Sequence, residues 1–180
     1  MNSITNHFEE VVDGLNMLDE SEIWQVIKIL RFTKVTGGTV WLFGNGGSHA
    51  TAGHFANDLV KMCGIRAVCL GDMASAVSAY GNDNGQENMF VDLLKEMLKE
   101  EDCAFGISCS GNSANVIRAL EHAKSQSVYT LGMTGSSLHS IINDCGLDGL
   151  VHTPGAQDIR VQEDLHLIIC HAIARSLHDG

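Results

Sequence analysis

Thr39-Val40-Trp41-Leu42-Phe43-Gly44-Asn45-Gly46-Gly47-Ser48 decides the fold of this chain, because it reads as a strand, a tight turn and a helix start in succession. Thr39 to Phe43 is apolar, as in a buried strand, and a helical pattern begins after Ser48. Glycines let the backbone approach a ligand, and a helix N-terminus offers free N–H groups and a positive dipole end. The stretch therefore predicts a phosphate-binding loop, with a plain tight turn as the alternative.

Two nucleotide-binding fingerprints are absent from this loop. His49 stands where the dinucleotide motif G-x-G-x-x-G requires its third glycine, and no G-K-[ST] follows as in a nucleotide P-loop. The loop therefore matches neither nucleotide motif. If it binds a phosphate, its glycines, the Ser48 hydroxyl and the N–H groups of the following helix are expected to do so.

A second strand and loop repeat the pattern. Ala104 to Ile107 reads as a buried strand, and Ser108-Cys109-Ser110-Gly111-Asn112-Ser113 leads into a helix from residue 114. The hydroxyls of Ser108, Ser110 and Ser113, with backbone amides at the helix start, can satisfy phosphate oxygens without Arg or Lys. The alternative is helix capping by Ser113. Two such loops favour a phosphorylated ligand.

Composition is that of one globular domain. The chain has 180 residues, of which 44% are hydrophobic and 18% charged, with one proline. We expect a single domain over 1–180, made of an N-terminal helical hairpin (1–37) and an α/β core with a C-terminal helix (38–180). The formal net charge of −11 argues against nucleic acid as the main ligand, because a phosphate backbone requires a basic face.

The cysteines and the N-terminal residues indicate the cellular compartment of the protein. The six cysteines show no C-x-x-C spacing and read as reduced thiols. The first residues lack a signal-peptide pattern, and no apolar run approaches the roughly 20 residues needed to span a bilayer. The sequence therefore predicts a cytoplasmic protein with no membrane partner.

Strands and helices alternate after the hairpin, which predicts an α/β fold with a parallel sheet covered on both faces. Ligands of such sheets bind at the carboxyl ends of the strands, where both loops fall. The expected strands are 39–43, 67–70, 103–107, 128–133 and 149–152, and the expected helices are 49–62, 73–80, 86–100, 114–125, 138–143 and 158–177.

Two helices carry candidate catalytic or metal-binding residues. His54 and Asp58 are spaced i, i+4, so they share a helix face and could hold a divalent metal or act as acid and base. A surface ion pair is the alternative. On the last helix, Glu163 and Asp164 lie within about 80° of His171, while Gln162 falls on the opposite side. His171 could equally be a hydrogen-bonded core residue.

The successive motifs resemble the sugar isomerase (SIS) domain family, and within it the phosphoheptose isomerases. The resemblance rests on Gly44-Asn45-Gly46-Gly47-Ser48, His54-Phe55-Ala56-Asn57-Asp58-Leu59, Gly81-Asn82-Asp83 and the stretch from Gly106 to Val116. It implies a three-layer α/β/α sandwich whose terminal helices build a homotetramer, with active sites between subunits. It also implies phosphate or sugar binding at Asn45, Gly46, Gly47, Ser48, Asp83, Ser108, Cys109, Ser110, Asn112 and Ser113.

The resemblance further implies metal ligands at His54, Asp58, Glu163 and His171, with zinc as the ion, and acid–base roles for Asp58, Glu163 and His171. Asp58 stands where the family has Glu, and Glu163 where it has Gln. A register that keeps Gln162 in the family position needs an extra residue inside the helix. That residue would rotate everything beyond it by about 100°.

The activity implied is aldose–ketose isomerisation of sedoheptulose 7-phosphate to D-glycero-D-manno-heptose 7-phosphate, for bacterial surface polysaccharides, through an enediol. One alternative is a non-catalytic SIS protein that binds a phosphosugar as a regulator or binds the replication initiator. Another is a sugar-phosphate epimerase or a different isomerase, which would share both loops.

Overall fold

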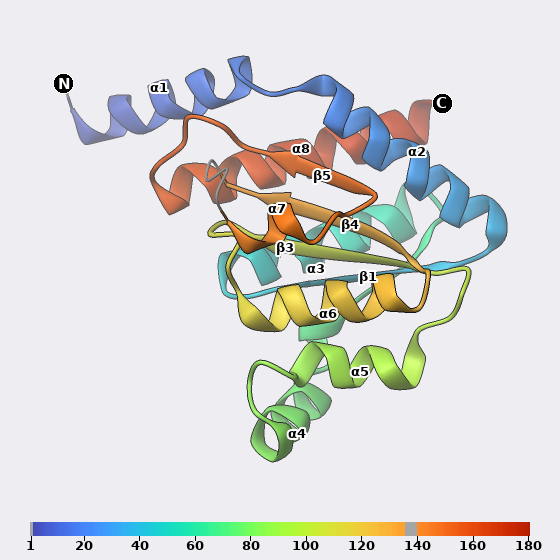
Figure 1. Ribbon diagram of the computed structural model, residues 1–180. Coiled ribbons are helices and arrows are strands. Elements are labelled where there is room, and N and C mark those ends of the chain that lie inside the picture. Colours follow the sequence, from blue (N-terminus) through green and yellow to red (C-terminus); the bar gives the residue numbers. More distant parts are fainter. Residues whose placement is uncertain (1, 136–139) are drawn as a thin grey trace.

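Five strands form a parallel sheet in the order β2-β1-β3-β4-β5 (Figure 1). The computed structural model describes residues 2–135 and 140–180. The strands are β1 (Thr39–Gly44), β2 (Arg66–Cys69), β3 (Cys103–Ser108), β4 (Tyr129–Thr134) and β5 (Gly149–His152). The helices are α1 (Ser3–Asn16), α2 (Glu20–Thr36), α3 (Gly47–Lys61), the 3₁₀ helix η1 (Leu70–Asp72), α4 (Ala74–Asn84), α5 (Met89–Met97), α6 (Ala114–Ser125), α7 (Ile141–Asp144) and α8 (Ile159–Asp179).

The predicted three-layer α/β/α sandwich is confirmed. Side chains of α2, α3 and α8 pack with β1 and β3 in one hydrophobic core. A second core lies on the other face of the sheet, where α5 and α6 contribute buried side chains and α4 adds partly buried ones. In Figure 1, α4, α5 and α6 lie below the sheet, whereas α1, α2 and α8 lie above it. Each face of the sheet is therefore covered, as continuous apolar parallel strands require.

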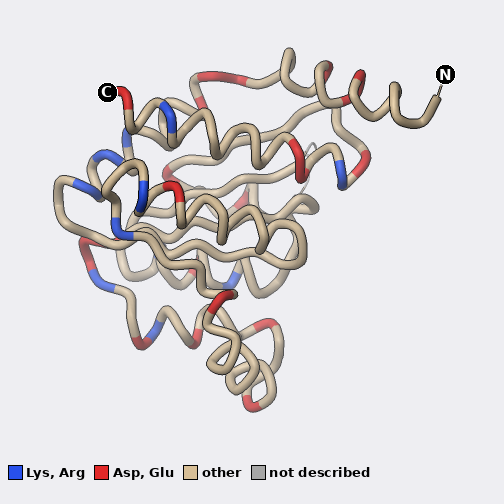
Figure 2. The backbone as a smooth tube through the Cα atoms, turned by 180° about the vertical axis from the view of Figure 1, so that it is seen from behind, with Lys and Arg blue, Asp and Glu red and all other residues tan. Residues whose placement is uncertain are grey.

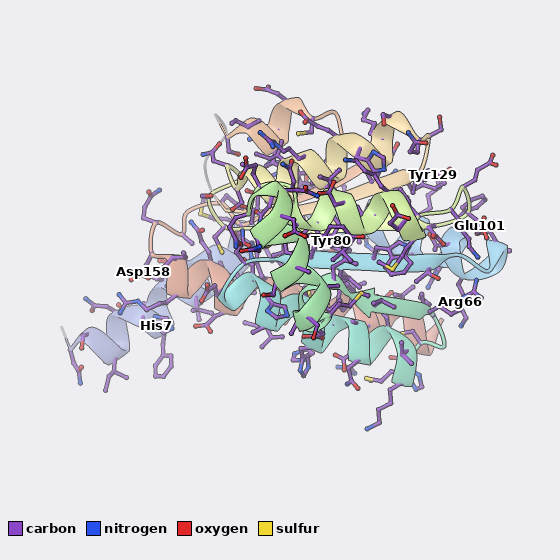
Figure 3. The ribbon with its side chains drawn as sticks, turned by 90° about the horizontal axis from the view of Figure 1, so that it is seen from below. His7, Arg66, Tyr80, Glu101, Tyr129 and Asp158 are labelled. Atoms are coloured by element: carbon purple, nitrogen blue, oxygen red, sulfur yellow. The ribbon has the colours of Figure 1, made fainter. Side chains whose placement is uncertain are left out.

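The strand order places a topological switch point between β1 and β3. The chain runs from β1 through α3 to β2 on one side, and from β3 through α6 to β4 on the other. The loops that follow β1 and β3 consequently diverge to opposite faces and leave a crevice at the carboxyl ends of these strands, where ligands of open α/β sheets bind. In Figure 3, Arg66 and Glu101 lie at the strands' amino end and Asp158 at the opposite end.

Most predicted elements are observed within a few residues of their expected bounds, and the largest difference is α5. We expected a helix over 86–100, but it spans Met89–Met97. Gly85 has a positive φ of 91° and ends α4. At the other end, the Asp102 carboxylate accepts hydrogen bonds from the Lys99 and Thr39 backbone amides, which fixes a turn in place of another helical turn. The expected helix 138–143 begins outside the described residues.

Charges are unevenly distributed. Figure 2 shows Lys and Arg mostly on the side of the molecule where the chain ends, whereas Asp and Glu are spread more widely. The loops after β1 and β3 contain neither Lys nor Arg. An anion at those loops would be bound by amides and hydroxyls. Among the described residues, no helix is long and apolar enough to cross a membrane.

Candidate active site

The two predicted loops meet at the switch point. Asn45 in the first loop and Asn115 in the first turn of α6 exchange side-chain hydrogen bonds of 2.9 and 2.8 Å. Ser48 Oγ lies 3.7 Å from Cys109 Sγ, which belongs to the second loop. Residues that were predicted from two separate sequence motifs therefore lie next to one another.

The second loop gathers its hydroxyl groups. Ser108 Oγ donates to Ser113 Oγ at 3.0 Å and lies 3.5 Å from Ser110 Oγ. Ser110 Oγ also accepts a hydrogen bond from the Asn112 backbone amide. The Asn112 side chain points elsewhere, because its Oδ1 accepts the Ile141 amide at the start of α7. Three hydroxyls thus lie at the N-terminus of α6, as a phosphate site requires.

The first loop depends on two glycines. Gly46 has a φ of 54°, which favours glycine, and a Cβ there would meet no atom within 4 Å, so the space beside it is open. At Gly47, the first residue of α3, a Cβ would lie 2.2 Å from the Glu163 carboxylate. Only glycine therefore allows Glu163 to sit against the start of α3, where the helix dipole favours a negative charge.

Three of the four predicted metal ligands converge. His54 Nε2 lies 2.9 Å from His171 Nε2, so one ring nitrogen donates its proton to the other. Asp58 Oδ2 lies 3.4 Å from His54 Nε2 and 3.8 Å from His171 Nε2. Asp58 is buried, whereas about half of each imidazole is exposed. A buried carboxylate thus faces two accessible imidazoles.

The packing of α3 against α8 explains which residues meet. The helices lie side by side, with Gly47 against Glu163, His54 against His171, and Cys63 donating to the Ala174 carbonyl oxygen. Glu163 precedes His171 by eight residues, about 12 Å along the helix axis. Glu163 is accordingly not part of the His54–Asp58–His171 group, and it lies at the phosphate-loop end of α3 instead.

Asp83, predicted to orient the sugar, lies apart from both loops. It is exposed near the end of α4, and its carboxylate accepts a hydrogen bond from the neighbouring Asn82 side chain. None of the contacts found in the described part of the chain joins Asp83 to the first or second loop. Figure 1 shows α4 projecting from the molecule beyond α5.

Two buried polar residues of α8 were not predicted, and one of them, His166, borders the second loop. His166 is fully buried, with its Nδ1 3.7 Å from Cys109 Sγ, and burial lowers the pKa of this imidazole to about 4. Its Nε2 has no hydrogen-bond partner among the described residues. Gln162 is also buried and donates to the Ala156 carbonyl oxygen, away from the His54 group. The hydrophobic spacing of α8, which places both positions inward, is the signal that could have identified them.

Cys109 lies in the second loop, and its thiol is buried. Burial raises the pKa of its thiol, and the Glu163 carboxylate raises it further. The sulfur lies 3.7 Å from Ser48 Oγ and 3.7 Å from His166 Nδ1, so the thiol packs between the first loop and α8.

The His54–Asp58–His171 group fits a metal ion. Two imidazole nitrogens and one carboxylate oxygen, all within 4.8 Å of one another, match the donor set and the three-ligand pattern of catalytic zinc sites. The exposed imidazole edges would leave a position open to a ligand. These donor atoms do not single out zinc, because imidazole also binds other divalent transition metals.

This chain was compared with protein-family models, with curated proteins and with solved structures, and each comparison found similar proteins. A family model described as SIS domain matches residues 4–135. Phosphoheptose isomerase from Aneurinibacillus thermoaerophilus is 36% identical over 149 residues, which are 80% of this chain and 74% of that protein. The structure of phosphoheptose isomerase from Neisseria gonorrhoeae superposes with a TM-score of 0.88 at 28% identity, covering 98% of this chain and 95% of that one. The Vibrio vulnificus NanR protein complexed with ManNAc-6P shares the fold at 15% identity, with a TM-score of 0.72 over 98% of this chain and 61% of its own.

Proposed function

The chain belongs to the SIS domain family and, within it, to the phosphoheptose isomerases, and we propose that it converts sedoheptulose 7-phosphate into D-glycero-D-manno-heptose 7-phosphate. The reaction moves a hydrogen from C1 to C2 through an enediol. It needs a phosphate site, a base beside the C–H bond and a group that moves a proton between the two oxygens. The observation that carries the proposal is the convergence of His54, Asp58 and His171 two helical turns from the phosphate loops.

The phosphate binds between the two loops. The hydroxyls of Ser48, Ser108, Ser110 and Ser113 and the amides at the starts of α3 and α6 donate to its oxygens. Asn45, held by Asn115, orients a sugar hydroxyl beside Gly46, where the space is open. Glu163 lies at the same end and limits how far an anion can enter over Gly47.

The length of α3 favours a long sugar. His54 follows Gly47 by seven residues, which is roughly 10 Å along the helix. An extended seven-carbon sugar phosphate spans roughly the same distance between its carbonyl end and its phosphorus. With the phosphate on the loops, C1 and C2 reach the His54 group.

Asp58 is the base and His171 the proton shuttle. Asp58 removes a proton from C1 as the C1–C2 double bond forms, and His171 gives a proton to O2, which yields the enediol. Asp58 then returns its proton to C2 while His171 takes the proton from O1, which leaves the C1 aldehyde and restores both groups. The Asp58 carboxylate and the His171 imidazole lie close together, so both groups can act on adjacent substrate atoms.

His54, Asp58 and His171 would hold a divalent metal, with zinc as the proposed ion. When bound, such an ion polarises a carbonyl or enediol oxygen. Asp58 would then use one carboxylate oxygen as ligand and keep the other for proton transfer. Glu163, two helical turns from His171, lies against Gly47 at the phosphate-loop end of the site.

We also propose a homo-oligomer, a tetramer by likeness to the family. Ile4, Phe8 and Val12 form an exposed stripe along α1, spaced four residues apart. The exposed edges of His54 and His171 are consistent with a site that a second copy covers. Light scattering after size exclusion gives the mass, and Phe8→Glu should shift it toward the monomer. Because a phosphorylated sugar is a cytoplasmic metabolite, we place the enzyme there.

The test of the activity is direct. Purified protein, analysed for metal, is incubated with sedoheptulose 7-phosphate, and the product is followed by proton NMR with and without added zinc. In D₂O the aldose should carry deuterium at C2, the signature of proton exchange through an enediol. Binding without conversion, shown by a thermal shift with the same sugar, would instead favour a regulatory phosphosugar-binding protein.

A further inference from the structure

A second group of metal-ligating side chains lies at the carboxyl end of β2. His49 comes from the first turn of α3, Cys69 is the last residue of β2, and Asp72 ends η1. Their ligand atoms all lie within 4.8 Å of one another, and His49 Nε2 is 2.9 Å from Asp72 Oδ1. The start of α3 and the β2–η1 junction therefore bring a nitrogen, a sulfur and an oxygen to one point.

The surroundings of Cys69 suit a metal-bound thiolate. The sulfur is buried, and the backbone amides of Gly71 and Asp72 donate toward it from the turn of η1. Such N–H donors stabilise negative charge on sulfur.

The His49 ring packs against Gly71 and is hydrogen-bonded to Asp72. A Cβ on Gly71 would lie 2.5 Å from His49 Cδ2 and Nε2, so only glycine lets the imidazole pack against the chain there. The His49 side chain is about one-third exposed and that of Asp72 about two-thirds exposed. The buried sulfur thus lies beneath two ligands that solvent can reach, which gives an ion a path of entry.

We propose that His49, Cys69 and Asp72 bind one divalent transition-metal ion of the zinc and cobalt class. A sulfur, an imidazole nitrogen and a carboxylate oxygen select such borderline ions over Mg²⁺ and Ca²⁺, which take oxygen ligands. The fourth position is open to solvent. This site differs from the His54 group, which contains no sulfur, and the proposal does not depend on the isomerase reaction.

The ion would tie the first turn of α3 to η1. His49 directly follows Ser48 of the phosphate loop, and η1 leads into α4. Linking these segments would hold the loop end of α3 against the edge strand of the sheet. The expected result is a higher melting temperature with metal bound.

Cobalt(II) alone is the probe, because a Co²⁺–thiolate bond gives a near-ultraviolet charge-transfer band that imidazole and carboxylate ligands do not. Titration of the full chain should raise this band to saturation at one thiolate-bound ion per chain. Cys69→Ala should abolish the band, and Asp72→Asn, on the surface, should weaken cobalt binding at this site at least about tenfold. Cys145→Ala, which removes another accessible thiol, should leave the band unchanged, as should His54→Ala.

Circular dichroism melts establish that each variant is folded. A wild-type chain without the band, or a band that persists in Cys69→Ala, would overturn the proposal. So would an Asp72→Asn variant that binds cobalt as tightly as wild type. Loss of the band in His54→Ala would assign the thiolate to the other site and overturn it as well. None of these outcomes depends on whether the chain isomerises a heptose.

Discussion

Asn45 and Asn115, which are 70 residues apart in the chain, exchange two side-chain hydrogen bonds of 2.9 and 2.8 Å. Each amide acts as donor and acceptor, so the pair is geometrically specific. Asn45 lies in the loop after β1 and Asn115 in the first turn of α6 after β3. The pair therefore fixes the spacing of the two phosphate loops across the switch point of the sheet.

Asn45→Ala should weaken both folding and substrate binding. The change leaves the buried amide of Asn115 without its partner, which costs about 1–3 kcal/mol of unfolding free energy. We expect KM for the sugar phosphate to rise more than kcat falls. Urea denaturation and steady-state kinetics measure the two effects. Asn82→Ala, at an exposed amide with only a local partner, is the control; equal stability losses in both variants would contradict the role of the pair.

Asp58→Asn should lower kcat by a factor of about 10²–10⁴, because the amide keeps the shape of the base but cannot accept the C1 proton. Glu163→Gln should lower it less than about tenfold, since Glu163 lies against Gly47 and two turns from the His54 group. Single-turnover rates and deuterium exchange at C2 measure the step. If Glu163→Gln is the more damaged variant, Glu163 is the base.

His171→Ala should abolish turnover and remove one bound zinc per chain. It deletes both a ligand nitrogen and the proton shuttle beside Asp58. Elemental analysis after dialysis gives the stoichiometry, and proton NMR gives the activity. His178→Ala is the control. His178 lies on the same helix and hydrogen-bonds to the Met62 carbonyl oxygen, so this variant should retain both zinc and activity. Full activity in His171→Ala would remove this residue from the mechanism.

Stability should fall on acidification because of His166. Burial lowers the pKa of this imidazole to about 4, below its unfolded value of about 6.5, so the unfolded chain binds the extra proton between these values. The contribution is complete above pH 6.5 and is lost as the pH falls toward 4, by up to about 3 kcal/mol. Urea midpoints between pH 4 and 7 measure it. His166→Met, which cannot titrate, should show a shallower slope; an unchanged slope would assign the effect to other groups.

The zinc dependence of the activity is a separate test. Chelation followed by dialysis should remove activity, and added zinc should restore it if His54, Asp58 and His171 hold the working ion. The Cys69→Ala variant keeps these three ligands and should be restored equally. A Cys69→Ala variant that zinc fails to restore would instead place the working ion at the His49 group.

Much of this protein could be predicted from local sequence. The alternation of strands and helices predicted the α/β sandwich, and two Gly- and Ser-rich loops predicted the edge of the sheet that binds a ligand. Both signals are local, because they depend on hydrophobic periodicity and on turn residues. His54 and Asp58 could be paired because four residues on a helix fix their common face. These patterns also carried the resemblance to phosphoheptose isomerases that the related chains confirm.

What only the tertiary structure decided is how those elements meet. The sequence puts Glu163 and His171 on neighbouring faces of α8, about two turns apart. Only the packing of α3 along α8 brings Glu163 against Gly47 and His171 against His54. The Asn45–Asn115 pair and the His49–Cys69–Asp72 group likewise join segments that carry no shared local signal. The sequence determined its helices, strands and loops through short-range periodicity, whereas long-range packing of the sheet and its helices decided which side chains share a site.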